Sequence, residues 1–111
     1  MRLLILIFSL AGCASNTDYE AHRLALWNFS YQADVADEWK VYDRIDQPFS
    51  GDCEDFSLSL QKQIGGKVWY VLLHDGTAHA ALVKNKMVYD SLFNRPVEQD
   101  KYKGTFLYIM N

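Results

Sequence analysis

Three residues in this sequence are suited to nucleophilic catalysis: Cys53, His79 and Asp90. A cysteine thiolate can attack a carbonyl carbon, an imidazole can move the proton, and a carboxylate can orient the imidazole. Free cysteines are more often small buried hydrophobic residues. The segments that hold these three side chains therefore decide whether the chemistry is available.

The segment around Cys53 predicts the start of a helix. Asp52 is a favourable N-cap residue, and Asp55, three positions later, can complete a capping box. Apolar residues then recur at helical spacing, and a glycine pair ends the pattern. These residues are Phe56, Leu60, Ile64, Gly65 and Gly66. We therefore expect Cys53 at a helix N-terminus, where unpaired N–H groups and the helix dipole favour a thiolate.

The segment from His79 to Asp90 predicts a β-hairpin. Asn85 tolerates the positive φ of a tight turn. A two-residue turn at Lys84-Asn85 places His79 directly opposite Asp90, and a turn at Asn85-Lys86 makes them diagonal neighbours on one face. A three-residue turn would place them on opposite faces. In the first two registers, one carboxylate can hold one imidazole.

These blocks resemble the bacterial transglutaminase-like cysteine proteinases, a branch of the papain-like fold. The matching blocks are Gly51-Asp52-Cys53-Glu54-Asp55-Phe56, His79-Ala80-Ala81-Leu82-Val83 and Val88-Tyr89-Asp90, within roughly residues 27 to 92. Upstream counterparts of family residues are Asn28, Tyr31, Asp34, Asp37 and Trp39, and the family's Trp-x-x-Pro reads Trp39-Lys40-Val41-Tyr42 here.

The resemblance implies an α+β fold with a papain-like or transglutaminase-like core. In such a core, N-terminal helices and a catalytic helix pack on a small antiparallel β-sheet. The resemblance also implies that Cys53 is the nucleophile, His79 the base and Asp90 the orienting residue. Papain-like enzymes carry an oxyanion-binding glutamine about six residues before the cysteine, and Gln47 stands there. A solvated loop glutamine is the alternative.

The carboxylates beside Cys53 raise an electrostatic question, because like charge disfavours a thiolate. Helix caps could direct Asp52, Glu54 and Asp55 away from the sulfur, or a cation could neutralise them. Some periplasmic members of the resembled family bind calcium through acidic residues at the positions of Asp52 and Glu54. Two carboxylates fall short of the roughly six to eight oxygens of a calcium site. We therefore expect no required cofactor, with calcium at Asp52 and Glu54 as the alternative.

Residues 1–12 predict a targeting segment. Arg2 precedes an apolar run, and Leu10-Ala11-Gly12-Cys13 resembles a bacterial lipobox. The run is shorter than the ~20 residues that span a bilayer. By this resemblance, Cys13 becomes the lipidated first residue of the processed chain. An ordinary signal peptide or a buried N-terminal helix is the alternative.

The lipobox divides the chain into residues 1–12 as signal peptide, residues 13–18 as lipidated cysteine and polar tether, and residues 19–111 as the domain. By the same resemblance to lipoproteins, Ala14 at the next position implies the outer membrane, with the domain facing the periplasm. An envelope location also permits disulfides. A Cys13–Cys53 bridge is therefore the alternative to a lipid anchor.

The remaining pattern predicts a helical region and several strands. Residues 18–45 read as helical, with a break near Asp34, and an aromatic stripe there predicts core packing. The stripe is Leu24, Trp27, Tyr31, Val35, Trp39 and Tyr42. Strands are expected over residues 67–73 and 105–110, with a turn at Asp75-Gly76 and a loop over residues 94–104. The hairpin is apolar on both faces and is expected to be covered on both sides.

The other two histidines carry weaker expectations. His22 is expected to be a surface or packing residue, and His74 is an alternative base without an evident partner. A zinc site from His74, His79 and Cys53 lacks the usual ligand spacing and a fourth ligand.

Composition places an upper bound of one domain on these 111 residues. A hydrophobic content of 50% with 14% aromatic residues indicates a packed core rather than disorder. The net charge of −3, without a basic cluster, argues against nucleic-acid binding.

Together these patterns predict an envelope-anchored cysteine peptidase that hydrolyses amide bonds of a protein or peptide substrate and acts as a monomer. If an amine instead of water releases the acyl group, the same site is a transglutaminase. A non-catalytic envelope lipoprotein that binds a partner through the same fold is the alternative. A small disulfide-stapled lipoprotein is a third.

Overall fold

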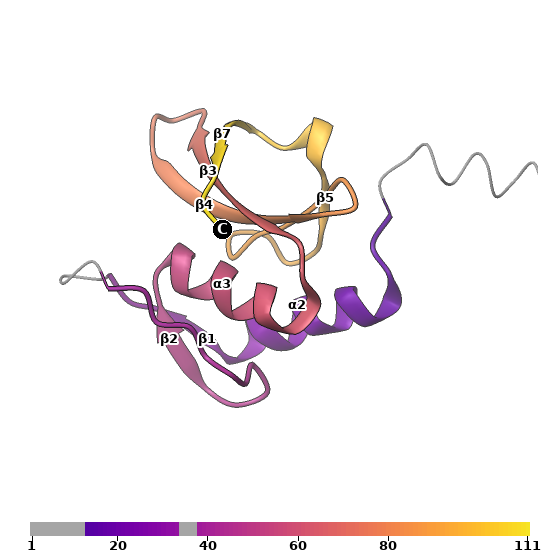
Figure 1. The fold of residues 1–111 in the computed structure, drawn as a ribbon, viewed down its shortest axis with the longest axis vertical. Helices are drawn as coiled ribbons and strands as arrows, with labels where there is room; N and C mark the ends of the chain where they lie inside the picture. Colours follow the sequence, from indigo (N-terminus) through magenta and orange to yellow (C-terminus); the bar gives the residue numbers. More distant parts are fainter. Residues whose placement is uncertain (1–12, 34–37) are drawn as a thin grey trace, which may run out of the picture.

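The structure is a computed structural model that describes residues 13–33 and 38–111. It is an α+β domain in which two helices lie against a five-stranded antiparallel sheet (Figure 1). The helices are α2 (Asn16–Asn28) and α3 (Cys53–Ile64), and a 3₁₀ turn, η1, covers Gln99–Lys101. The strands are β1 (Phe29–Tyr31), β2 (Phe49–Gly51), β3 (Lys67–Leu73), β4 (Ala78–Lys84), β5 (Met87–Tyr89), β6 (Val97–Glu98) and β7 (Gly104–Ile109). The expected α+β class is confirmed.

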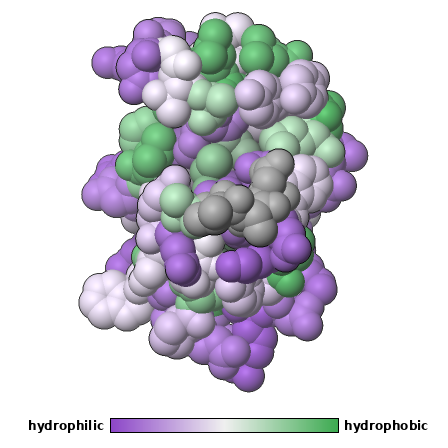
Figure 2. All heavy atoms as spheres, turned by 90° about the vertical axis from the view of Figure 1, so that its left-hand side faces the viewer, coloured by the Kyte–Doolittle hydropathy of each residue, from purple (hydrophilic) through white to green (hydrophobic). Residues whose placement is uncertain are grey.

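The sheet has the strand order β6-β5-β4-β3-β7, and a separate parallel pair joins β1 to β2. Figure 2 views the molecule from the side on which β2 leads into α3. Apolar side chains gather over the sheet in the upper half of that view, and polar side chains dominate the lower half. None of the helices in the described part of the chain is long and apolar enough to cross a membrane.

Helix α3 begins and ends where the sequence predicts. Asp52 Oδ1 accepts from the backbone N–H groups of Glu54 and Asp55, at 3.0 and 3.1 Å, and Asp55 Oδ2 accepts from the N–H of Asp52 at 3.0 Å. This reciprocal pair is a capping box. Gly65, with φ +84°, closes the helix. The capped end presents Cys53 as the first helical residue.

The β4–β5 hairpin adopts the second of the two registers that keep His79 and Asp90 on one face. Val83 pairs with Val88, so the turn consists of Asn85 and Lys86, with φ of +52° and +64°. Two positive φ values in a two-residue loop are typical of a type I′ turn. His79 and Asp90 are therefore diagonal neighbours, as this register requires.

Two hydrophobic clusters lie on opposite faces of the hairpin. The first fills the space between helices and sheet and contains Phe56, Leu60, Val68, Ala80, Leu82, Met87 and Tyr89. The second lies on the other face and contains Val71, Ala81, Val83, Val88 and Tyr102. The expectation that the hairpin is covered on both sides is confirmed.

The predicted helix over residues 18–45 is wrong beyond Asn28. There α2 ends and the chain extends into β1, and residues 38–48 form no regular helix or strand. The predicted core stripe is also wrong, because Leu24, Trp27, Tyr31 and Trp39 are exposed, and Trp27 has 86% of its surface accessible. Tyr42 is half-buried against the first cluster. Val35 and Asp34 lie outside the described residues.

The buried face of α2 is mainly polar. A hydrophobicity pattern therefore predicted the wrong face of this helix as buried. Asp18, His22 and Ala25 are buried at spacings of four and three. Lys84 Nζ forms an ion pair with Asp18 Oδ2 at 2.8 Å, and His22 donates to the backbone oxygen of Asp90. Polar side chains can be buried when each meets a specific partner, and apolar periodicity does not detect such partners.

Two further segments differ from the expectation. α2 starts at Asn16, because the Ser15 hydroxyl accepts from the Asp18 N–H, so residues 16–18, expected to belong to a polar tether, are helical. The expected loop over residues 94–104 contains β6 and η1.

Candidate active site

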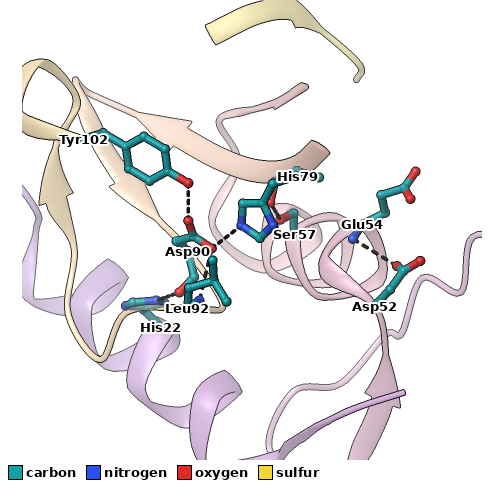
Figure 3. A network of polar contacts seen from close by, with 9 residues as sticks. His22, Asp52, Glu54, Ser57, His79, Asp90, Leu92 and Tyr102 are labelled. Carbon is teal, nitrogen blue, oxygen red and sulfur yellow. Dashed lines mark hydrogen bonds and ion pairs between the residues drawn. The ribbon is translucent and has the colours of Figure 1, made fainter. Parts of the chain in front are cut away.

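His79 and Asp90 form a buried pair at the centre of the candidate site. His79 Nε2 lies 2.6 Å from Asp90 Oδ1, and the two side chains are 6% and 0% exposed. Figure 3 shows the imidazole between Asp90 and the first turns of α3. Since Nε2 donates to the carboxylate, Nδ1 is the nitrogen that remains for Cys53.

Besides Asp90, His79 contacts the side chain of Cys53. Burial disfavours the imidazolium, but hydrogen bonds and charge from Asp90 and Cys53 outweigh it and raise the pKa of His79 to about 9. The cysteine is a half-buried free thiol at the first residue of α3. The Ser57 hydroxyl donates to the Ala80 carbonyl at 3.3 Å, which holds α3 against β4 beside the histidine. The structure thus brings Cys53, His79 and Asp90 together.

Asp90 makes three further contacts (Figure 3). The backbone N–H of Leu92 donates to Oδ1 at 3.1 Å, and the Tyr102 hydroxyl donates to Oδ2. His22 Nε2 donates to the backbone oxygen of Asp90 at 2.9 Å. Burial and the charge of Asp90 raise the pKa of the Tyr102 phenol, so Tyr102 remains a donor.

Sequence reasoning missed Tyr102 entirely and did not foresee the contact of His22 with Asp90. Tyr102 stands in a segment that carries no strand or helix pattern and lies 12 positions after Asp90. His22 offered one signal, since it lies four positions from Asp18, on the same helical face.

The acidic residues around Cys53 are engaged by N–H donors. The Trp39 indole N–H donates to Glu54 Oε2 at 2.6 Å, and the Lys40 backbone N–H donates to Asp55 Oδ1 at 2.6 Å. Burial raises the pKa of Asp55, and its two backbone donors partly offset that effect. The capping box accounts for Asp52 and Asp55, and the Trp39 indole engages Glu54.

The donor set gives no separate support for calcium. The Asp52 and Glu54 oxygens in these contacts accept from protein N–H groups. Across residues 13–33 and 38–111, no group of three or more His, Cys, Asp or Glu side chains is arranged to hold a metal ion. Calcium at Asp52 and Glu54 stays a prediction from resemblance.

Other predicted site residues lie apart from the His79–Asp90 pair. Gln47 is exposed on the loop before β2, and none of the described hydrogen bonds joins it to Cys53. His74 is exposed at the turn after β3. Cys13 is an exposed free thiol, so the structure contains no Cys13–Cys53 bridge.

The upstream counterparts have mixed positions. Asn28 Nδ2 donates to the carbonyls of Leu24 and Ile45, each at 3.0 Å, and so fixes the end of α2. Tyr31 is exposed. Trp39 lies beside the first turn of α3, where its indole N–H donates to Glu54. Asp34 and Asp37 lie outside the described residues.

No family model matches this sequence, and no curated protein matches it.

Proposed function

We propose that this chain is a cysteine-dependent hydrolase that cleaves amide bonds, built on a papain-like or transglutaminase-like core. One observation carries the proposal: a buried histidine links a buried aspartate to a cysteine at the first residue of a capped helix. In this arrangement His79 can be charged beside the thiol, and the helix N-terminus favours a thiolate.

The reaction uses the two nitrogens of the His79 ring in different roles: Nε2 is held by Asp90, and Nδ1 moves the proton. Cys53 Sγ attacks the amide carbonyl carbon, and His79 Nδ1 gives its proton to the leaving amine nitrogen as the C–N bond breaks. The product is a thioester and a free amine. Water then attacks the thioester carbon and gives a proton to His79, and the C–S bond breaks to release the carboxylic acid.

Backbone geometry supplies a donor for the oxyanion. The Asp52 side chain takes the N–H groups of Glu54 and Asp55, which leaves the N–H of Cys53 in the first turn of α3 for the substrate oxygen. If a primary amine replaces water in the second half, the same site transfers the acyl group and acts as a transglutaminase.

The proposal includes an envelope location with a lipid on Cys13 and a protein or peptide substrate. The exposure of Cys13 supports the anchor, as does its position two residues before Ser15, the N-cap of α2. A lipid there would hold the domain close to the membrane.

Incubation of the full chain with p-nitrophenyl acetate, followed by intact-protein and peptide mass spectrometry, tests the proposal. We expect an acetyl group on Cys53, retained in the matched variant Cys13→Ser and absent from Cys53→Ser. Added methylamine would yield the N-methyl amide if acyl transfer competes with hydrolysis. Failure to acetylate Cys53 at any pH between 6 and 9 would favour the non-catalytic binding module.

A further inference from the structure

The segment after Asp90 folds back over the site. Val88 of β5 pairs with Val97 of β6, and the Gln99 N–H donates to the Lys86 carbonyl at 2.8 Å. The turn η1 follows and delivers Tyr102 into the interior, where 7% of its surface is accessible. A residue remote from the hairpin turn thereby reaches the aspartate at the hairpin's end.

The ring of Tyr102 is fixed on both sides. It meets Phe93 edge-on, with ring centroids 5.8 Å apart, and contacts Phe106 at 5.3 Å. Packing of this kind leaves a side chain few alternative rotamers. The packed ring therefore holds the hydroxyl in place to donate to Asp90 Oδ2.

We propose that Tyr102 is a positioning residue for the acyl-transfer reaction, one that orients Asp90 and lowers the basicity of its carboxylate toward His79. This inference rests on the proposed function.

Orientation follows from the way in which the two carboxylate oxygens are divided. Oδ1 accepts from His79 Nε2 and from the Leu92 N–H, whereas Oδ2 accepts from Tyr102. A carboxylate held at both oxygens cannot rotate and exchange them without losing a buried hydrogen bond. The His79 ring therefore keeps its plane and its nitrogen assignment.

The charge argument gives the direction of the second effect. A donor on Oδ2 shares the negative charge of Asp90, and the positive end of the hydroxyl dipole, directed at Oδ2, offsets part of that charge. Both effects weaken the stabilisation of the His79 imidazolium. Without the hydroxyl, His79 would hold its proton more firmly and give it less readily to a leaving amine.

Tyr102→Phe tests the proposal, with Tyr108→Phe as the matched control, because Tyr108 is exposed on β7 and stacks on Tyr70 away from Asp90. We expect kcat for p-nitrophenyl acetate hydrolysis to fall about tenfold, the equivalent of one hydrogen bond, with KM little changed, because less of His79 is neutral and able to accept the proton of the water that attacks the thioester. The NMR titration midpoint of His79 should rise in Tyr102→Phe and stay unchanged in Tyr108→Phe. In an Asp90→Asn background, Tyr102→Phe should add no further loss.

Unchanged kcat and an unchanged His79 titration in a folded Tyr102→Phe protein would overturn the inference and leave the proposed function intact. A wild-type protein that never acylates would instead remove the proposed function, and the titration shift would still report on the Tyr102–Asp90 contact. If Tyr102→Phe does not fold, the wild-type hydroxyl proton gives the answer. A slowly exchanging, downfield resonance supports the contact, and a freely exchanging one contradicts it.

Discussion

At the scale of single residues, two histidines contact Asp90, and their pKa values are shifted in opposite directions. His79 meets the carboxylate and Cys53, which together outweigh burial and raise its pKa to about 9. Burial lowers the pKa of His22 from 6.5, and it outweighs the hydrogen bond to the backbone oxygen of Asp90 and the charge of Asp90. Its other nitrogen, Nδ1, is buried without a hydrogen-bond partner among the described residues. One aspartate therefore lies between a charged and a neutral histidine.

These opposite shifts predict the pH dependence of stability. The raised pKa of His79 contributes stability that is complete below pH 6.5 and is lost as the pH rises through about 9. The lowered pKa of His22 contributes stability that is present above pH 6.5 and is lost as the pH falls. Urea unfolding should therefore show the contributions of both histidines together only near pH 6.5.

Two variants separate these contributions. In His22→Gln, the unfolding free energy should decline less steeply between pH 6.5 and 5. In His79→Gln, it should decline less steeply between pH 6.5 and 9. Equal slopes in wild type and variants would show that neither histidine has a shifted pKa.

At the scale of elements, the cap of α3 also holds the preceding loop against the helix. Asp55 accepts from the N–H groups of Asp52 and Lys40, so one carboxylate joins the cap to the segment that carries Trp39. A side chain on Gly51 would overlap that carboxylate, which gives a reason for glycine at this position. The cap and the loop therefore depend on the same buried group.

This double role predicts an unusually large capping effect. Asp55→Ala should lower the unfolding free energy by about 2–4 kcal/mol, because it removes half of the capping box and leaves two partly buried N–H groups without their acceptor. Ser15→Ala, the matched variant at the simple N-cap of α2, should cost about 1 kcal/mol. Urea unfolding at pH 7 compares them. Similar losses in both would indicate that the Lys40 contact adds nothing.

The elements that sequence patterns predicted well are those whose signals are local. The capping residues and glycines bound α3, and Asn85 fixes the hairpin turn within one residue, which places His79 and Asp90 on one face. The failures lie where burial depends on distant partners. His22 is buried with its ring N–H donating to the backbone oxygen of Asp90, and Tyr102 is buried because η1 turns it inward toward the Asp90 carboxylate. Neither contact leaves a periodic trace in the sequence.

At the scale of the whole molecule, Asp90 lies where two hydrophobic clusters meet. His22 reaches it from α2, on the side of the first cluster, and Tyr102 from the second cluster. The hairpin between these clusters carries His79, while α3, packed on the first, carries Cys53. The site therefore requires both hydrophobic clusters in their native packing. Unfolding of the segments around either cluster should disable it.

The pH dependence of Cys53 alkylation tests the central claim most directly. The chain should carry Cys13→Ser, so that iodoacetamide reports on one thiol, and should be compared with the same chain carrying His79→Ala. We predict similar alkylation rates at pH 6 and pH 8, because imidazolium at His79 persists up to about pH 9 beside the sulfur. In His79→Ala the rate at pH 6 should fall toward the behaviour of an ordinary thiol, which loses roughly two orders of magnitude between pH 8 and pH 6. Identical pH profiles with and without His79 would contradict the Cys53–His79 pair and the hydrolase proposed from it.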